Sequence, residues 1–379
     1  MPTSITFETS TISAAIRNAA RIAPTTRGMA FDHAAGLYLM VDPANEFPLV
    51  IQSTNLEMFY TEWVTALEAD GPATAWRLPS MALDKIIGSL PIGAGKTVTF
   101  TETDKLMQVE VTSGRGLRAR FNGINRHREF PTWIPFDPDL LTEVPALGGQ
   151  IKLVEWAAAS GGSAVIMSGI HLDGEVAIAT DATKAAIMPC LIEKLDKSVT
   201  IPPQTLSLIL KESASAKLAV VGETLCVMPD AWTQIKVRTF GETYPAAKIR
   251  KSLGRELDGQ IETDRDELLA LINRVAAIDM TNRTPCLNVW FGNEEIACFM
   301  ESGEIGLLRD IVDCPGQALH KRVKYMFNPK NFIDLLVSAP EKKIKLGYGQ
   351  HLTPMISLSC GDYQAWIARM VPPKERKDP

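Results

Sequence analysis

The stretch WRLPSMALDKIIGSLPIGAGKTVTF, residues 76–100, decides the fold, because its pattern occurs three times in the chain. The other two occurrences are VTIPPQTLSLILKESASAKLAVVGE, residues 199–223, and KYMFNPKNFIDLLVSAPEKKIKLGYG, residues 324–349. Leu78, Ile201 and Phe327 hold the same place in the three segments, and a proline follows each within two residues. Apolar residues at helical spacing come next, and each segment ends in an alternating run typical of a strand. The three segments therefore predict one helix-to-strand unit that repeats along the chain.

The GAGKT sequence in the first unit raises the alternative of a phosphate-binding loop. Such a loop needs a glycine five positions before the glycine of Gly-Lys-Thr, and its anion site is the amino end of a following helix. Leu90 stands at the required position, and the residues after Lys96 alternate like a strand. We therefore interpret GAGKT as the structural turn from helix to strand, equivalent to SAKLAVVG and EKKIKLGYG in the other units.

A further helical segment precedes each of the three. These segments are TSTISAAIRNAARIA near the start, KLVEWAAASGG from Lys152 and DRDELLALINRVAAID from Asp264. Short strand-like pieces such as GLYLMV, VAIATD and CLNVWF fill most of the remaining sequence. Each unit of about 120 residues thus holds two amphipathic helices and several short strands, and a period of that length indicates homologous domains.

The repeat predicts an α+β protein of three domains, each with two helices on antiparallel β-sheets. The connections NGINRHREFPTWIPFDPDLLTEVPALGG and FGETYPAAKIRKSLGRELDGQ carry the charges, glycines and prolines expected of links. We place the domains at residues 1–140, 141–257 and 258–379, the last with a short C-terminal extension.

Composition narrows the class of protein. The 379 residues are 46% hydrophobic and 22% charged, as in globular proteins with a sizeable core. The formal charge of −5 argues against a chain coated in lysine, but it leaves room for a local basic surface. The six cysteines are scattered without a CxxC, which predicts reduced thiols and no metal. Neither a signal sequence nor an apolar run of membrane length occurs, so we expect a cytoplasmic protein without a membrane segment.

Four short motifs, in order, resemble those of a known family. STNLEMFYTEWV and REFPTW stand in the first unit, and VAIATDATKAAIM and ETYPAAKIRKSL stand in the second. With the threefold repeat, they resemble the bacterial sliding clamp, the beta subunit of DNA polymerase III, from Ile5 to about Pro372. The motifs depart from the family at Ala182-Thr183-Lys184, where it has Gly-His-Arg, and after Pro245, where it has Asp-Tyr. Such departures would also suit a divergent or phage member.

The resemblance implies a ring of six domains around duplex DNA, made by two chains joined head to tail, with the helices facing the hole. It implies a processivity factor that tethers the replicative polymerase and carries no catalysis or cofactor of its own. Its partners would be duplex DNA of any sequence, a second copy of the chain, and polymerase and clamp-loader subunits that bind through short peptides. Its place would be the cytoplasm, at the nucleoid.

The helices supply candidate DNA contacts. Phosphate contacts independent of base sequence suit a ring that slides, and moderate charge is enough for them. The resemblance places Arg27 in a loop that touches DNA. The expected DNA-binding residues are Arg17, Arg21, Arg27, Lys85, Lys152, Lys211, Arg274 and Lys330. The alternative is that these are solvated charges, since the nearby Asp84, Glu155, Glu212 and Asp334 offset several of them.

The resemblance also implies an apolar pocket that receives aliphatic and aromatic side chains of partner peptides. Transferred position by position, its residues are Met167, Thr180, Thr183, Lys184, Pro245, Ile249, Met370, Val371 and Pro372. The alternative for these residues is packing between domains. We transfer no subunit-interface residues, because GLRARFN places Arg118 or Arg120 where the family has apolar side chains.

Two other classes of function stay open. The histidines lie far apart and form no metal or triad spacing, yet a hydrolase assembled from distant residues is an alternative. A β-rich scaffold or interaction protein that uses the same repeat without DNA is another. Release from a DNA circle on linearisation would separate a clamp from a scaffold, and turnover lost on one polar substitution would indicate an enzyme.

Overall fold

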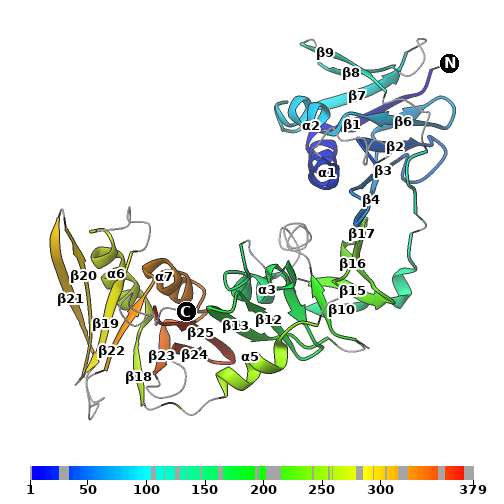
Figure 1. Ribbon diagram of the computed structural model, residues 1–379. Coiled ribbons are helices and arrows are strands. Elements are labelled where there is room, and N and C mark those ends of the chain that lie inside the picture. Colours follow the sequence, from blue (N-terminus) through cyan, green and yellow to red (C-terminus); the bar gives the residue numbers. More distant parts are fainter. Residues whose placement is uncertain are drawn as a thin grey trace, which may run out of the picture. The chain divides into compact units, whose positions relative to one another are not determined.

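The structure is a computed structural model, and its chain divides into two compact units (Figure 1). Unit 1 comprises Met1–Ala146 with Gln204–Thr239, and unit 2 comprises Leu147–Pro203 with Phe240–Pro379. The structure describes residues 2–24, 34–103, 108–114, 116–123, 129–133, 135–145, 147–160, 165–192, 195, 197–201, 215–240, 243–254, 257, 259–278, 285–292, 294–303, 305–314, 323–348 and 355–370.

Among its described residues, unit 1 has two antiparallel sheets and two helices. The five-stranded sheet has the order β5-β1-β7-β8-β9, and the eight-stranded sheet has the order β10-β15-β16-β17-β4-β3-β2-β6. The helices are α1 (Thr9–Ile22) and α2 (Ser80–Gly88). The strands are β1 (Ser4–Glu8), β2 (Leu37–Val41), β3 (Leu49–Thr54), β4 (Met58–Val64), β5 (Glu68–Asp70), β6 (Thr74–Leu78), β7 (Thr97–Glu102), β8 (Gln108–Ser113), β9 (Leu117–Asn122), β10 (Thr142–Pro145), β15 (Ser215–Val221), β16 (Thr224–Asp230) and β17 (Thr233–Arg238).

Unit 2 repeats this plan. Its eight-stranded sheet has the order β14-β11-β12-β13-β25-β24-β23-β18, and its four-stranded sheet has the order β21-β20-β19-β22. The helices are α3 (Leu147–Glu155), α5 (Ala246–Leu253), α6 (Arg265–Ala276) and α7 (Pro329–Val337). The strands are β11 (Ile170–Leu172), β12 (Val176–Thr180), β13 (Lys184–Pro189), β14 (Val199–Ile201), β18 (Gly259–Asp264), β19 (Leu287–Gly292), β20 (Glu295–Ser302), β21 (Gly306–Asp313), β22 (Val323–Phe327), β23 (Lys343–Tyr348), β24 (Met355–Cys360) and β25 (Tyr363–Ala368).

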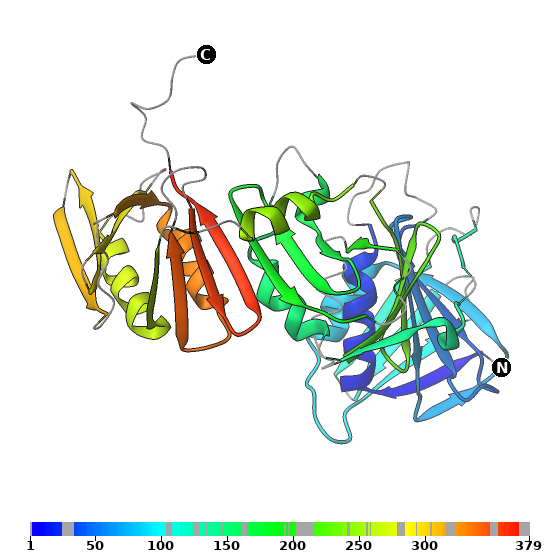
Figure 2. The same ribbon diagram turned by 90° about the horizontal axis from the view of Figure 1, so that it is seen from below.

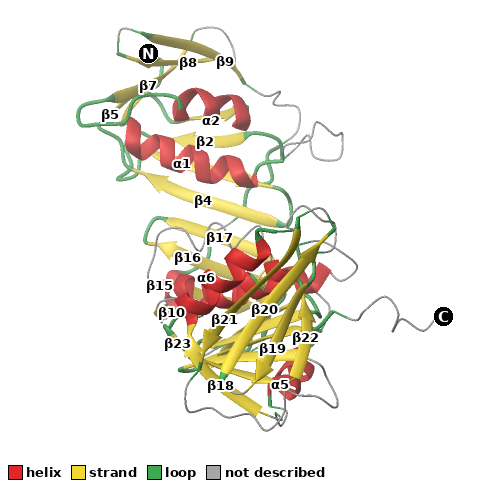
Figure 3. Ribbon diagram, turned by 90° about the vertical axis from the view of Figure 1, so that its left-hand side faces the viewer, coloured by secondary structure: helices red, strands yellow, loops and turns green. Residues whose placement is uncertain are grey.

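Helix α1 shows how a core forms in this fold. Ile12, Ile16 and Ala19 recur at helical spacing and are fully buried, which gives the helix one apolar face. The helix lies beside α2 over strands of unit 1 (Figure 3). Its polar face carries Arg17 and Arg21, which are exposed. The sequence pattern thus fixes which side of the helix meets the sheet and which side stays in solvent.

The alignment of Leu78, Ile201 and Phe327 predicted from the sequence has a direct structural counterpart. Each of these residues closes its strand and pairs across the sheet with an apolar residue. The pairs are Leu78 with Leu37, Ile201 with Ile170, and Phe327 with Leu287. All six side chains are buried. The repeated unit therefore holds one register in all three parts of the chain.

The turn before β4 and the turn before β13 are also alike. Leu56 and Ala182 have φ angles of 75° and 73°, a left-handed conformation that is uncommon for residues with a Cβ. The Thr54 hydroxyl donates to the carbonyl of Met58 at 2.7 Å, and the Thr180 hydroxyl donates to that of Lys184 at the same distance. STNLEM and ATDATK, two of the motifs behind the resemblance, thus fold into one turn.

Most predicted elements are confirmed, and two differ. GAGKT lies in the turn between α2 and β7, as predicted. Helix α3 begins at Leu147, ahead of the start expected at Lys152. The sequence pattern missed this first part of the helix because the glycines in LGGQIKLVE are poor helix formers. Residues 246–253, expected to be part of a link, form α5, since Pro245 can precede a helix and AAKI provides good helix formers. The helix predicted within the segment 199–223 falls on residues 202–214, which lie outside the described residues.

The compact units cut across the predicted second domain, residues 141–257. Strands β10, β15, β16 and β17 belong to unit 1, whereas α3, β11–β14 and α5 belong to unit 2. Sheet pairing causes this division, because β17 pairs with β4 and β13 pairs with β25. In Figure 2 the strands near residues 170–190, in green, lie beside those near 355–368, in red. The domain boundaries predicted from the sequence stay a prediction.

Candidate functional site

Helix α1 carries a basic exposed face. Its sequence TSTISAAIRNAARI holds two arginines and no acidic residue. A terminal nitrogen of Arg17 lies 3.4 Å from the position of a Cβ built on Gly88, at the C-terminal end of α2. That end of a helix carries partial negative charge and favours a cation. The guanidinium of Arg17 thus lies close to the C-terminal end of α2, and Arg21 stands one turn further along α1.

The other predicted DNA-binding lysines are exposed on separate helices. Each of these helices also carries an acidic residue next to the lysine or within four positions of it, so the local charge is close to balanced. The lysines and their neighbours are Lys85 with Asp84, Lys152 with Glu155, and Lys330 with Asp334. These helices therefore offer weaker anion sites than α1 does.

The structure gives Arg274 a partner. Its Nε and a terminal nitrogen lie 2.7 and 2.6 Å from Oδ2 of Asp310 on β21, a two-point ion pair. The hydrogen bond from Arg274 lowers the pKa of Asp310. A guanidinium held in this way is less available to a phosphate. The sequence could not reveal this contact, because 36 residues separate the two groups. Arg27 and Lys211, also predicted, lie outside the described residues.

The predicted partner pocket falls on an apolar cluster in unit 2 beside α5 and the β13–β25 pair. We call it the outer cluster, and its buried members are Ile166, Ile178, Ala185, Tyr244, Ile249, Met355 and Trp366. Met167 packs at its margin, so the structure brings together two predicted residues, Met167 and Ile249. Pro245 stands between Tyr244, a buried member of the cluster, and Ala246, which packs at its margin.

The predicted threonines belong to the turn at the edge of this cluster. Thr180 is buried and uses its hydroxyl to close the turn, whereas Thr183 is exposed. The backbone N–H of Ala368 donates to the carbonyl of Thr183 at 2.7 Å, which joins the end of β25 to the turn. The ammonium of Lys184 lies 5.4 Å from the ring centre of Trp156, within the range of a cation–π contact. Thr183 is therefore a polar residue at the edge of the cluster, whereas Lys184 alternates with the cluster member Ala185 along β13 and contacts Trp156, which is not part of the cluster.

The C-terminal predicted residues are only partly described. Met370 is half-buried, and its backbone N–H donates to the carbonyl of Met326 at 2.6 Å. Val371 and Pro372 lie outside the described residues. The sequence reasoning missed Tyr244, Met355 and Trp366 as members of the site. The alternation in YQAWIA could have indicated Trp366, since it places that residue two positions from Gln364 on one face of β25.

A charged group supports the cluster from α5. Arg250 pairs with Asp173 and lies 3.7 Å from Oε2 of Glu175. Burial acts to raise the pKa of Asp173, but the hydrogen bonds from Arg250 and from the backbone N–H groups of Val176 and Glu175, with the charge of Arg250, together leave that pKa below its usual value. His171 lies in the same region, and burial lowers its pKa. These contacts fix α5 against the strand that carries His171.

Other features of the described chain lie away from these residues. A cavity of about 440 Å³ in unit 1 is lined by parts of β2, β6 and β8 with Phe130 and Thr132, and none of the predicted residues line it. The six cysteines are free, and burial raises the pKa of Cys190 to about 11. Within the described part of the chain, we find neither a cluster of three or more potential metal ligands nor a helix long and apolar enough to span a membrane.

Comparison with known proteins identifies the fold. No protein-family model matches the chain, and no curated protein matches it. The DNA polymerase III subunit beta of Pseudomonas aeruginosa is 16% identical with a TM-score of 0.80, over 97% of this chain and 100% of that one. The Thermotoga maritima beta subunit is 17% identical with a TM-score of 0.82, over 97% and 99%. The Bacillus subtilis sliding clamp is 14% identical with a TM-score of 0.83, over 98% and 100%. The chain therefore has the fold of these sliding clamps, and the predicted α+β clamp fold is confirmed.

Proposed function

We propose that this chain is a DNA sliding clamp, a processivity factor that holds the replicative polymerase on duplex DNA. The observation that carries the proposal is the match in fold to sliding clamps over almost the full length of both chains. The basic face of α1 adds a second, independent argument. No catalytic step is part of the proposed role, and we place the protein in the cytoplasm at the nucleoid.

Two chains would make the ring. Three domains cover half of a six-domain circle, so a head-to-tail pair of chains closes it, with boundaries near residues 140 and 257. The strands would form the outer layer and the helices would face DNA. Arg17, Arg21 and Arg27 are the residues we expect to contact phosphates most, followed by Lys85, Lys152, Lys211 and Lys330, while Arg274 is engaged with Asp310.

The outer cluster would receive the polymerase and the clamp loader. Its apolar members lie beside α5 and the β13–β25 pair, and the turn with Thr183 gives it a polar rim, an arrangement typical of a small peptide site. Val371 and Pro372 would complete it from the C-terminal end. The departures from the family at residues 182–184 fall on this rim, so we expect a changed peptide preference there.

Topological retention on DNA tests the proposal. Labelled protein is assembled on a nicked plasmid circle at high protein concentration, and the complex is isolated by gel filtration. We expect the protein to stay with the circle, to leave when one restriction cut linearises the plasmid, and to stay when both ends of the linear DNA are blocked by bulky groups. The blocked linear DNA is the matched control, because it differs only in its ends.

Other outcomes identify the competing functions. Binding that ignores linearisation indicates an ordinary DNA-binding protein, because no ring then holds the duplex. Failure to associate with circular DNA at any salt concentration indicates a scaffold that uses the fold without DNA. Both outcomes contradict a sliding clamp.

A further inference from the structure

The strand pairings β4–β17 and β13–β25 place two glutamines at equivalent positions of the repeat. The matching turns align Met58 with Lys184, because the carbonyls of these residues accept the hydrogen bonds of the two turn threonines. Three residues further along β4 and β13, the neighbouring strand presents a glutamine across the pairing. The pairs are Thr61 with Gln234 and Ile187 with Gln364. Gln234 in unit 1 and Gln364 in unit 2 therefore correspond.

Gln234 holds a passing stretch of main chain. The backbone N–H of Phe136 donates to Oε1 of Gln234 at 3.2 Å, and Nε2 of Gln234 donates to the carbonyl of Phe136 at 3.1 Å. The glutamine is only 4% exposed, so both bonds are shielded from water. A side-chain amide carries one acceptor group and one donor group, and here both are used on one residue. Gln234 thus reads the backbone of Phe136 and not its side chain.

The chain that Gln234 holds also brings aromatic rings to the sheet. The ring of Trp133 meets the ring of Phe59 edge-on, with centres 5.0 Å apart. The ammonium of Lys236 lies 5.8 Å from the ring centre of Phe136. Phe59 and Lys236 face each other across the β4–β17 pairing. In unit 1 this surface is therefore covered by an aromatic segment of the same chain.

In unit 2 the corresponding part of the chain forms helix α5. It follows Tyr244-Pro245, as the unit 1 segment follows Phe130-Pro131. Helix α5 packs Ile249 on the outer cluster, and the backbone hydrogen bonds of a helix run along its own axis. It does not present an extended main chain to Gln364. That glutamine is exposed, and among the residues that the structure describes its side chain has no hydrogen-bond partner.

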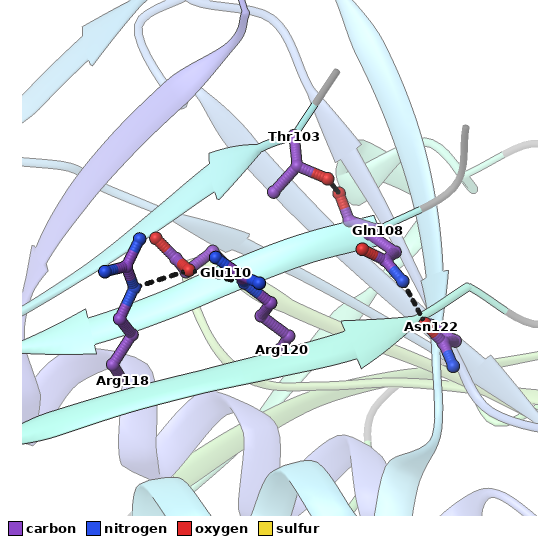
Figure 4. A network of polar contacts seen from close by, with 6 residues as sticks. All are labelled: Thr103, Gln108, Glu110, Arg118, Arg120 and Asn122. Carbon is purple, nitrogen blue, oxygen red and sulfur yellow. Dashed lines mark hydrogen bonds and ion pairs between the residues drawn. The ribbon is translucent and has the colours of Figure 1, made fainter. Parts of the chain in front are cut away.

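Gln364 borders the outer cluster. It stands two residues before Trp366 on the same face of β25, and its cross-strand partner Ile187 packs at the margin of the cluster. A glutamine on a strand can find a side-chain partner on the neighbouring strand. Gln108 on β8 does so, since its Nε2 donates to Oδ1 of Asn122 at 2.7 Å, as Figure 4 shows. Gln364 makes no such contact within the described chain, so its amide is available to a ligand.

We propose that Gln364 binds the main chain of a partner peptide at the outer cluster, taking the N–H and C=O of one peptide residue as Gln234 takes those of Phe136. The ligand is an extended peptide with an aromatic side chain at the held residue, placed beside Trp366, the counterpart of Lys236. The proposal rests on the proposed clamp role of the outer cluster and names a contact and a ligand class for it. Main-chain recognition accepts different sequences, which suits a site that serves several partners.

The chain itself supplies the probe. The peptide FPTWIPFD copies residues 130–137, and a fluorescent label allows its binding to the full chain to be followed by anisotropy. We expect one peptide to bind per chain, in unit 2. The unit 1 segment is not displaced by the peptide at micromolar concentration, because a tethered segment acts at an effective concentration of about millimolar. Met167→Lys, at the margin of the outer cluster, should weaken the binding.

Gln364→Leu tests the glutamine. Leucine keeps the approximate size of the side chain and removes both its donor and its acceptor, and the exposed position leaves folding unaffected. We expect peptide affinity to fall about tenfold, the effect of losing two hydrogen bonds shielded by the bound peptide. Gln260→Leu is the matched control, because Gln260 is an exposed glutamine on β18, at the far end of the same sheet. This control should bind the peptide as the parent does.

An ester analogue of the peptide tests the main-chain contact directly. In the analogue an ester oxygen replaces the backbone N–H of the second phenylalanine, so the group that Gln364 accepts from is absent. The parent chain should bind the ester about threefold or more weakly than the amide. Gln364→Leu should bind the two peptides equally, because the interaction is already lost. A glutamine with a purely structural role would leave the ester effect unchanged.

Three results overturn the proposal. They are an ester effect of equal size in the parent and in Gln364→Leu, unchanged affinity in Gln364→Leu, and binding that survives Met167→Lys. Retention on DNA circles without any effect of Gln364 contradicts the main-chain contact and leaves the clamp intact. Peptide binding that depends on Gln364, in a chain that circles do not retain, supports the contact and contradicts the clamp.

Discussion

The ring of Tyr244 stacks on the ring of His171, with centres 4.7 Å apart and planes 2° from parallel. Unit 1 has the same kind of stack between Phe130 and Tyr38, with centres 5.1 Å apart and planes at 11°. Both stacks place the aromatic residue of an aromatic-proline pair against a residue of the strand that follows the first helix of the repeat, β2 in unit 1 and β11 in unit 2. The motif that resembled a family signature in the sequence thus has a structural role. In unit 2 that role includes positioning α5, which starts immediately after Tyr244-Pro245.

The stack predicts an acid-sensitive step in stability. Burial lowers the pKa of His171, while Asp173 raises it and Arg250 lowers it, so the folded protein binds this proton less readily than the unfolded chain. The stabilisation of the folded state by neutral His171 is then fully present above the unfolded pKa of about 6.5. It is lost as the pH falls below that value toward the lower folded pKa. We expect the thermal midpoint of unfolding to fall between pH 7 and pH 5.

His171→Gln checks the assignment. Glutamine keeps a polar group near Thr200, whose hydroxyl lies 3.1 Å from Nδ1 of His171, but it does not titrate. The variant should lose part of the pH dependence between pH 7 and pH 5. Asp173 contributes in a separate window, because its folded pKa is lowered and its stabilisation is lost only below about pH 4. An unchanged slope in His171→Gln would assign the acid sensitivity to other groups.

The turn at Ala182 predicts a stabilising substitution. Ala182 is exposed and has a φ of 73°, a conformation that costs a residue with a Cβ about 1–2 kcal/mol more than it costs glycine. Ala182→Gly removes that cost but gives the unfolded chain more freedom. We expect a net gain of about 0.5–1 kcal/mol in the free energy of unfolding, measured by denaturant titration.

Thr183→Gly is the matched control in the same turn. Thr183 is not in the left-handed region, and its hydroxyl donates to Asp181 at 2.7 Å. Glycine there should destabilise the protein. A decrease in stability for Ala182→Gly would mean that the strain at this turn is offset by contacts of the methyl group.

The sequence predicted the repeat well, because three apolar ladders and three amphipathic helices leave a periodic record. Leu78, Ile201 and Phe327 hold equivalent places in the repeated sequence pattern. In the structure each of them pairs with a buried apolar residue on the neighbouring strand of its sheet. Local patterns carry this information, since each pattern needs only neighbours within one helix or strand.

Long-range pairings were not predictable in the same way. The pairings β4–β17 and β13–β25 join strands far apart in the chain, and no single segment of sequence indicates its partner. For the same reason Arg274 was predicted to contact DNA, although the fold gives it Asp310. The outer cluster was predicted only where motifs crossed it, so Met167 and Ile249 were found, while Met355 and Trp366 were missed.

The exposed face of α1 predicts a loss of DNA retention on charge reversal. Arg17→Glu with Arg21→Glu should shorten retention on circles and reduce the slope of log affinity against log salt by about 0.9 for each phosphate that the variant no longer neutralises. The double variant Arg238→Glu with Lys248→Glu carries the same charge change at exposed residues away from the helix pair. The charge of Arg21 also stabilises the C-terminal end of α1, so its reversal can lower the stability of the protein. Both double variants are therefore compared well below their unfolding temperatures. Equal losses in both doubles would make net charge, and not this helix, responsible.

The outer cluster predicts that a charge at its margin blocks peptide binding without unfolding the chain. Met167 is half-buried and packs against the cluster from outside, so Met167→Lys brings an ammonium to the apolar surface while the buried residues stay in place. We expect a fluorescent hexapeptide with leucine and phenylalanine side chains to lose about tenfold or more in affinity, the effect of removing one central apolar contact. Met81→Lys makes the same substitution at a methionine of α2 that is 50% exposed and should leave peptide affinity unchanged. If Met167→Lys binds the peptide as tightly as the parent does, the cluster serves packing alone and the partner site lies elsewhere.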